Sequence, residues 1–160
     1  MFETNPFPQS HSSTDTPWEK PWFEYKVQAF PHHTDYGGIV WHGTYISWME
    51  EARVEQLRLT GLDYHTLVEM GCELPVVDLN IRYHQAVKMG MQIVVKSRIL
   101  PVKGVRLIFE YRIESLDGQY HYLSAQVTLV AINRETGKIM RRFPPVLQAS
   151  LAQLVHELKL

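Results

Sequence analysis

The chain has 160 residues, of which 45% are hydrophobic and 21% are charged, a composition typical of one globular domain with a sizeable core. Its 16 Lys and Arg residues nearly balance its 17 Asp and Glu residues, and the resulting net charge of −1 argues against a nucleic-acid partner. No run approaches the ~18 consecutive apolar residues that a membrane span needs. The single cysteine, Cys72, excludes an intrachain disulfide, so we expect a reducing, cytoplasmic location.

Residues 1–20 are polar and rich in Pro, Ser and Thr. They lack the basic start and the apolar run of a secretory signal peptide. A segment of this composition cannot bury enough apolar surface to offset the entropy lost on ordering. We therefore expect a flexible N-terminal tail over residues 1–20 and a single domain over residues 21–160.

The domain is predicted to begin with a strand and a long helix. Residues 22–30 alternate between apolar and polar side chains, which predicts a half-buried strand. From about Trp41 to Thr60 the apolar spacing changes to three and four residues, which predicts a helix ended by Gly61. The inner face of this helix would carry Tyr45, Trp48, Met49, Ala52, Gln56 and Leu59, and a short helix would follow over residues 64–70.

The remainder of the chain predicts strands joined largely by hairpins. Residues 105–113 alternate most cleanly, with Val105, Leu107, Phe109, Tyr111 and Ile113 on one face. Other strands are expected over residues 74–83, 91–100 and 120–132, an edge strand over 138–142, and a C-terminal amphipathic helix from Leu147 onward. One strand, one long helix and then several strands indicate an α+β fold with an antiparallel sheet packed on one helix.

The segment from His33 to Tyr45, read as HTDYGGIVWHGTY, places the carboxylate of Asp35 in a glycine-containing loop that leads into the long helix. A helix N-terminus presents unpaired backbone N–H groups and a positive dipole end. Hydrolysis of a thioester needs a group that attacks or activates water and donors for the charge that develops on oxygen. The chain has no G-x-G-x-x-G, P-loop, G-x-S-x-G, C-x-x-C or H-E-x-x-H motif.

The same segment resembles the 4-hydroxybenzoyl-CoA thioesterase family of hotdog-fold enzymes, including its bacterial acyl-CoA thioesterase branch. The family pattern D-x-D-x-x-G-x-V, continued by W-x-E-x-A-R on the helix, is matched here by Asp35, Gly38, Val40, His42, Tyr45, Trp48, Glu50, Ala52 and Arg53, with the glutamate spacing off by one. His33 replaces the first carboxylate, and the loop after Tyr83 lacks the family's frequent proline. The resemblance covers about residues 23–142 and implies a hotdog fold, in which an antiparallel β-sheet wraps around one long central helix.

The resemblance implies that Asp35 acts as nucleophile or general base and that the backbone N–H groups near His42 and Gly43 hold the oxyanion. It also implies a substrate-binding role for Tyr45 as a pocket wall, and contacts from Lys103 and Arg106 to the CoA phosphates. Arg141 and Arg142 are alternatives for the phosphates. Coenzyme A would be part of the acyl-CoA substrate, with no retained cofactor and no metal. A homodimer or homotetramer would pair the open sheet edge across a two-fold axis.

Other interpretations of these residues stay open. Asp35 could be only a turn residue that bonds its own backbone. Glu50 or Glu51 could supply the carboxylate, as in another hotdog branch, although Glu50 and Arg53 are spaced to form an ion pair on the helix. A hotdog dehydratase or hydratase would pair His42 with one of these glutamates. A non-catalytic acyl-thioester binding module is the third alternative.

Overall fold

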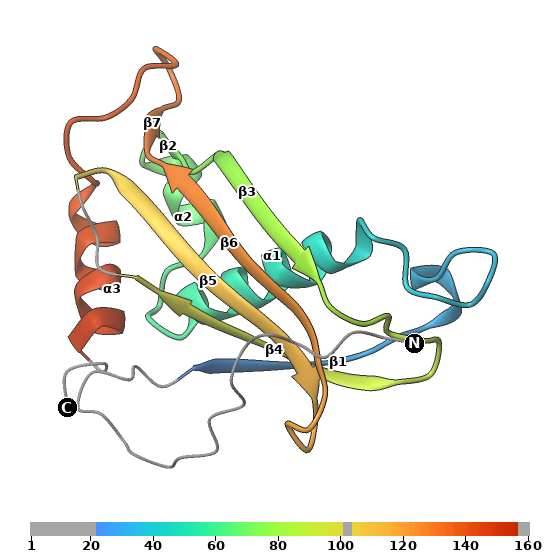
Figure 1. The fold of residues 1–160 in the computed structure, drawn as a ribbon. Helices are drawn as coiled ribbons and strands as arrows, with labels where there is room; N and C mark the ends of the chain where they lie inside the picture. Colours follow the sequence, from blue (N-terminus) through green and yellow to red (C-terminus); the bar gives the residue numbers. More distant parts are fainter. Residues whose placement is uncertain (1–21, 101–103, 157–160) are drawn as a thin grey trace.

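The computed structural model describes residues 22–100 and 104–156, so the expected tail over residues 1–20 lies outside the described part. Figure 1 shows one sheet that runs diagonally across the molecule, with the long helix behind it and the C-terminal helix at one end. Helices and strands follow in the order β1 (Phe23–Gln28), η1 (Pro31–His33), α1 (Thr44–Arg58), α2 (Tyr64–Glu69), β2 (Cys72–Glu73), β3 (Val76–Tyr83), β4 (Gln92–Ile99), β5 (Arg106–Ser115), β6 (His121–Val130), β7 (Ile132–Asn133) and α3 (Pro145–His156).

Within the described residues, the main sheet has five strands in the order β1-β4-β5-β6-β3, and every pair in it is antiparallel. Strands β2 and β7 form a separate antiparallel pair. The expected α+β architecture, an antiparallel sheet against one long helix, is therefore confirmed. None of the described helices is long and apolar enough to cross a membrane.

The core lies between the inner face of the sheet and α1. The predicted alternation of β5 is confirmed, because Leu107, Phe109, Tyr111 and Ile113 are fully buried while their neighbours are more exposed. Trp48, Met49 and Ala52 on α1 belong to the same core cluster. Burial of one such large apolar side chain contributes about 1.5–3 kcal/mol, so this interface supplies much of the fold's stability.

The long helix begins later than its apolar spacing indicates, at Thr44 and not near Trp41. The N–H of Trp41 donates to the carbonyl of His33, and the N–H of Thr44 donates to the carbonyl of Trp41, so residues 41–43 form a turn. The placement of Leu59 on the inner face is wrong, since its side chain is 70% exposed. Leu59 follows the last helical residue, and Leu57 is buried in its place.

Three further expectations differ from the structure. The strand expected over residues 74–83 starts at Val76, since Pro75 separates it from β2. The edge strand expected over residues 138–142 does not form, and one isolated bridge joins Ile139 to Ile132. The expected ion pair between Glu50 and Arg53 is replaced by a hydrogen bond from Arg53 Nη1 to the Tyr111 hydroxyl, 3.1 Å long, in the described part of the chain.

Strand β3 lies at one edge of the sheet, and among the described strands it pairs only with β6. Val76, Val77 and Leu79 on this strand are 48%, 51% and 39% exposed. An apolar edge strand with an unpaired row of backbone groups is a template for association with another chain. The opposite end of the strand, at Tyr83, leads directly into the functional site.

Candidate active site

The Asp35 loop, residues 29–43, is held in place by a facing segment, residues 84–91. At the base of the loop, the N–H of Ala29 donates to the Met91 carbonyl at 2.9 Å, and the N–H of Gly90 donates back to Ala29 at 2.7 Å. Further along, the N–H of Val40 donates to the Val87 carbonyl at 2.9 Å. The backbone of one segment therefore fixes the backbone of the other, although they are far apart in the sequence.

Asp35 lies at the tip of this loop with an exposed side chain. Its Oδ1 accepts hydrogen bonds from the N–H of Gly37 at 2.9 Å and of Ile39 at 3.2 Å. Gly38 has a φ of 75°, a backbone conformation that glycine adopts readily. The local turn chemistry expected of an aspartate is thus present, while Oδ2 has no hydrogen-bond partner among the described residues and is free to meet a substrate or a water.

The start of α1 presents two unpaired backbone donors. Neither the N–H of His42 nor that of Gly43 has an acceptor within the described ranges. Gly43 is the N-cap residue and offers no side-chain cap. The helix start is held from outside by the Thr44 hydroxyl, which donates to the His33 carbonyl at 3.0 Å. Open N–H groups at a helix N-terminus can stabilise a developing oxyanion.

His42 contributes through its backbone in this arrangement. Its ring is exposed and lies against the ring of Trp41, with centroids 4.7 Å apart. No hydrogen bond joins the His42 ring to Asp35 or to another described residue. The carbonyl of His42 accepts a hydrogen bond of 2.6 Å from the hydroxyl of Tyr83, at the end of β3.

Tyr45 lies in the core beneath the loop, with 3% of its surface exposed. Its hydroxyl accepts a hydrogen bond from the N–H of Val87 at 3.1 Å, and its ring meets Trp48 and Tyr83 edge to face. Burial raises the pKa of the Tyr45 phenol, so the hydroxyl keeps its proton at neutral pH. Tyr45 thus connects the facing segment to the helix through a hydrogen bond. Its expected contact with substrate stays a prediction.

The structure brings Asp35, His42, Gly43 and Tyr45 together at one end of the sheet. Arg106 opens β5 at the other end, where it pairs with Val130 (Figure 1). A ten-residue strand spans about 30 Å, so Arg106 and Asp35 of one chain do not meet. Lys103 lies outside the described residues. No local pattern predicts the bond between Tyr83 and His42, since the two residues are 41 positions apart.

Large apolar side chains are exposed near Asp35, beside the polar side chains of His32, His42 and Lys88. Tyr36 is fully exposed, and Ile39, Trp41 and Met89 are 40%, 53% and 51% exposed. These side chains come from the Asp35 loop and from the facing segment. Large apolar side chains grouped around one carboxylate suit an apolar acyl group better than a highly charged one.

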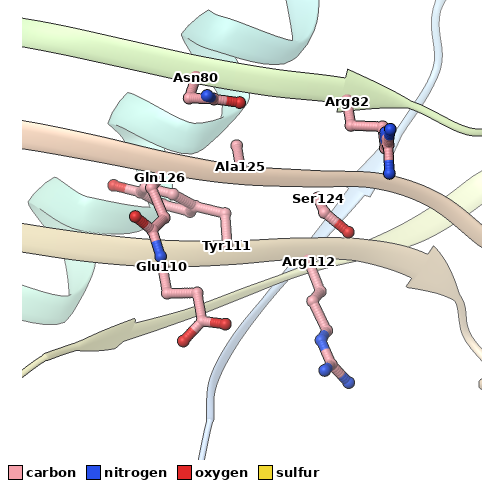
Figure 2. Close-up of a pocket in the computed structure, with 8 residues that line it drawn as sticks. All are labelled: Asn80, Arg82, Glu110, Tyr111, Arg112, Ser124, Ala125 and Gln126. Atoms are coloured by element: carbon pink, nitrogen blue, oxygen red, sulfur yellow. The ribbon is translucent and has the colours of Figure 1, made fainter.

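A hollow of about 380 Å³ lies elsewhere, on the face of the sheet opposite α1 (Figure 2). Figure 2 shows the side chains of Arg82 and Arg112 leaving the sheet on this face, on either side of Ser124. Glu110 on the same face pairs with Arg98 at 2.8 Å. The hollow is open and polar and contains no residue of the Asp35 loop, so the acyl group is not expected to bind there.

The two helix glutamates make no hydrogen bond to the Asp35 loop, although the charge of Glu51 acts on the His33 ring within it. Both glutamates are exposed, and Glu51 Oε2 accepts a hydrogen bond of 3.1 Å from the Tyr25 hydroxyl. No bond joins either glutamate to Asp35, His42 or Gly43 in the described part of the chain. Within residues 22–100 and 104–156, no three His, Cys, Asp or Glu side chains gather closely enough to hold a metal ion.

The chain is similar to several known proteins. A family model described as the thioesterase-like superfamily matches residues 30–151. The Synechocystis protein named "Putative esterase sll0410" is 50% identical over 133 residues, which cover 83% of this chain and 80% of that protein. The acyl-CoA thioesterase YbgC of Haemophilus influenzae is 34% identical over 92 residues, 57% of this chain and 68% of that protein.

The fold is also similar to solved structures. Slr0204, a 1,4-dihydroxy-2-naphthoyl-CoA thioesterase from Synechocystis, superposes with a TM-score of 0.77 at 23% identity and covers 85% of this chain and 99% of its own. This likeness confirms the hotdog fold that the segment from His33 to Tyr45 led us to expect.

Proposed function

Because the chain belongs to the thioesterase-like superfamily, we propose that it is an acyl-CoA thioesterase that hydrolyses an acyl-CoA to the free acid and CoA. One observation carries the assignment of the site. Asp35 presents a free carboxylate oxygen on the loop that leads to the open N–H groups of His42 and Gly43. A carboxylate and oxyanion donors are the two parts that thioester hydrolysis requires.

Asp35 has two possible roles in this reaction. As a general base it removes a proton from water while the water oxygen bonds to the carbonyl carbon; as a nucleophile its own oxygen forms that bond, and water then hydrolyses the resulting anhydride. In both routes the N–H groups of His42 and Gly43 stabilise the negative charge on the carbonyl oxygen by hydrogen bonding. The carbon–sulfur bond breaks, and the CoA thiolate leaves and takes up a proton. CoA is thus part of the substrate, and the proposed reaction needs no retained cofactor.

We infer a homodimer formed through β3, whose free edge and exposed Val76, Val77 and Leu79 are available for pairing. Antiparallel pairing of two β3 strands about a two-fold axis reverses the partner's sheet. The partner's Arg106 then falls at the end where this chain carries Asp35, and Arg106 can meet the phosphates of the CoA bound there. Sedimentation at micromolar concentration tests this, and a species of 18.7 kDa would contradict it.

We place this activity in the cytoplasm. The lone cysteine, Cys72, is buried, and burial raises the pKa of its thiol, so it stays an uncharged core residue. A reducing compartment is compatible with that state. Fractionation of the source cells with an antibody against the chain tests the location, and recovery in a secreted fraction would contradict it.

The function is tested by turnover across a panel of acyl-CoAs, with the released CoA thiol and the free acid both measured. Release of both from at least one substrate supports the proposal. Tight CoA binding with no turnover would instead indicate a binding module, and hydration of crotonyl-CoA without thiol release would indicate a hydratase. A single turnover in ¹⁸O-labelled water identifies a nucleophile when the label enters the Asp35 carboxylate, which requires attack of water on the Asp35 carbonyl of the anhydride. Trapping the acyl-Asp35 anhydride identifies a nucleophile when water attacks the acyl carbonyl instead.

A further inference from the structure

We propose that Tyr83 is a positioning residue of this site, whose hydroxyl fixes the peptide bond between His42 and Gly43 and thereby aims the Gly43 N–H at the substrate oxygen. The proposal rests on the thioesterase function proposed above. Tyr83 ends the edge strand β3, and its hydroxyl donates a 2.6 Å hydrogen bond to the His42 carbonyl.

The bond controls a donor on the other side of the same peptide unit. A trans peptide is planar, so its C=O and N–H point in opposite directions, and an acceptor held on one side holds the donor on the other. No other donor bonds the His42 carbonyl among the described residues, because the Thr44 N–H bonds the Trp41 carbonyl and the Ile46 N–H bonds the Gly43 carbonyl. Within the turn that the Thr44 N–H closes on the Trp41 carbonyl, Tyr83 is therefore the described residue that bonds the central peptide unit directly.

The peptide needs an external restraint because its own residues supply little. Gly43 carries no side chain and has no side-chain cap. Glycine adopts more backbone conformations than other residues, so a peptide beside it rotates more easily. The Thr44 N–H bonds the Trp41 carbonyl and the Thr44 hydroxyl bonds the His33 carbonyl, so the ends of this turn are held, but neither bond involves the C=O or the N–H of the central His42–Gly43 peptide.

Tyr83 is 45% exposed, and its ring is supported on one side. Its ring meets the ring of Tyr45 edge to face, with centroids 5.5 Å apart. Tyr45 in turn is buried and bonded to the N–H of Val87. Burial raises the pKa of the Tyr83 phenol, so the hydroxyl stays protonated and remains a donor through the neutral range.

The first test compares Tyr83→Phe with wild type, using Tyr64→Phe as the matched control. Tyr64 begins α2, is 51% exposed, and its hydroxyl bonds no described residue. Complete removal of an oxyanion donor costs about 10²–10³-fold in kcat, and a donor that is present but free to turn should cost less, roughly 10-fold. We expect Tyr83→Phe to lower kcat by that factor with KM within about two-fold, since the bond matters most when charge develops.

A second variant gives a signature that a purely structural role would not produce. 3,5-Difluorotyrosine, incorporated only at position 83, keeps the shape of the ring but ionises at lower pH because fluorine withdraws electrons. An ionised phenol no longer donates and repels the His42 carbonyl. The alkaline fall in kcat should therefore move to lower pH in this variant by the change in phenol pKa, and it should be absent in Tyr83→Phe.

The outcomes separate this proposal from the proposed function. A wild-type chain that hydrolyses no acyl-CoA overturns both. A wild type that is active, with a slow Asp35→Asn variant, leaves the function standing; Tyr83→Phe with the kcat of Tyr64→Phe then overturns the role of Tyr83. If Tyr83→Phe fails to fold in a thermal melt, the fluorinated protein decides: an alkaline limb that does not move overturns the proposal.

Discussion

Asp35 and Asp117 close turns of nearly the same local chemistry. Each accepts a hydrogen bond on Oδ1 from the N–H two residues ahead, at 2.9 Å from Gly37 and 3.0 Å from Gln119. A glycine in the left-handed region follows each aspartate, three residues on at Gly38 with a φ of 75° and directly at Gly118 with a φ of 74°. A short stretch of sequence around either aspartate would be read as the same kind of turn.

The two turns differ in what comes next. Asp117 joins β5 to β6, and the amides beyond it pair with neighbouring strands. Asp35 precedes a helix start, where the N–H groups of His42 and Gly43 have no partner among the described residues. The chemical capacity of an aspartate turn therefore depends on the segment that it leads into. Four paired tests, taken from the largest expected effect to the smallest, examine this difference.

Asp35→Asn keeps the size of the side chain and the turn, because asparagine tolerates this geometry, but it removes charge and basicity. Loss of a general base costs about 10²–10⁴-fold in rate, and loss of a nucleophile costs more. We expect the fall in kcat, with KM little changed, in steady-state hydrolysis of the best acyl-CoA. Asp117→Asn is the matched control. Equal activity of the two variants would remove the basis for assigning the chemistry to Asp35.

Gly43→Ala introduces a Cβ that would lie 2.0 Å from Cζ3 of Trp41. The φ of −77° at Gly43 suits alanine, so the effect comes from the collision and not from the backbone. Overpacking costs ~1–3 kcal/mol, and we expect about 1 kcal/mol here because the half-exposed Trp41 ring can turn outward. Displacement of the helix start should lower kcat roughly 10-fold, since small misplacements weaken catalysis.

The Trp41→Ala background checks the cause. If the ring collision is responsible, Gly43→Ala should lower kcat and the melting temperature much less in that background than in wild type. Equal costs in both backgrounds would show that glycine is needed at position 43 for another reason.

Glu50→Gln and Glu51→Gln should each keep kcat within about three-fold of wild type, a far smaller change than loss of a general base produces. Glu51 bonds the Tyr25 hydroxyl, and the exposed side chain of Glu50 bonds no residue of the Asp35 loop. Steady-state kinetics and melts measure both variants. An inactive glutamate variant beside an active Asp35→Asn would assign the carboxylate to the helix.

Asp117→Asn should leave kcat unchanged and alter only the pH dependence of stability. The Ser115 hydroxyl and the Gln119 N–H hold the pKa of Asp117 below its ordinary value of 3.8. The unfolded chain therefore binds this proton more readily, so the stabilisation is present above about pH 4 and is lost as the pH falls through the folded-state pKa. Melts of wild type and variant should differ at pH 7 and converge as the pH falls below 3.8; a difference that grows on acidification would contradict this.

The sequence predicted the Asp35 loop and its helix well because both depend on local patterns. Asp35, the glycines after it and the apolar spacing of the helix lie within one short segment. The helix start was placed too early because Trp41 continues the apolar spacing, whereas the bond from its N–H to His33 depends on the folded loop. Tyr83 could not be assigned in advance, since its role depends on register along β3.

The sequence also could not predict at which end of the sheet a given residue lies. Arg106 follows a turn, as phosphate-binding residues of the resembled family often do. The sequence does not show at which end of the molecule that turn lies. Pairing of Arg106 with Val130 places it at the end opposite to Asp35. The apolar composition of β3 predicted a strand correctly but not that Val76 and Val77 would be half exposed at a sheet edge.

Because the facing segment holds the Asp35 loop in place, the order in which the chain is synthesised affects when the loop can close. The loop is synthesised early, but its partners Val87, Gly90 and Met91 leave the ribosome some fifty residues later. Helix α1 can form from local contacts, whereas closure of the loop needs non-local pairing, which is slow. A nascent or refolding chain therefore gains helical structure before it gains a working site, and a chain truncated before residue 84 carries Asp35 in a loop that nothing holds closed.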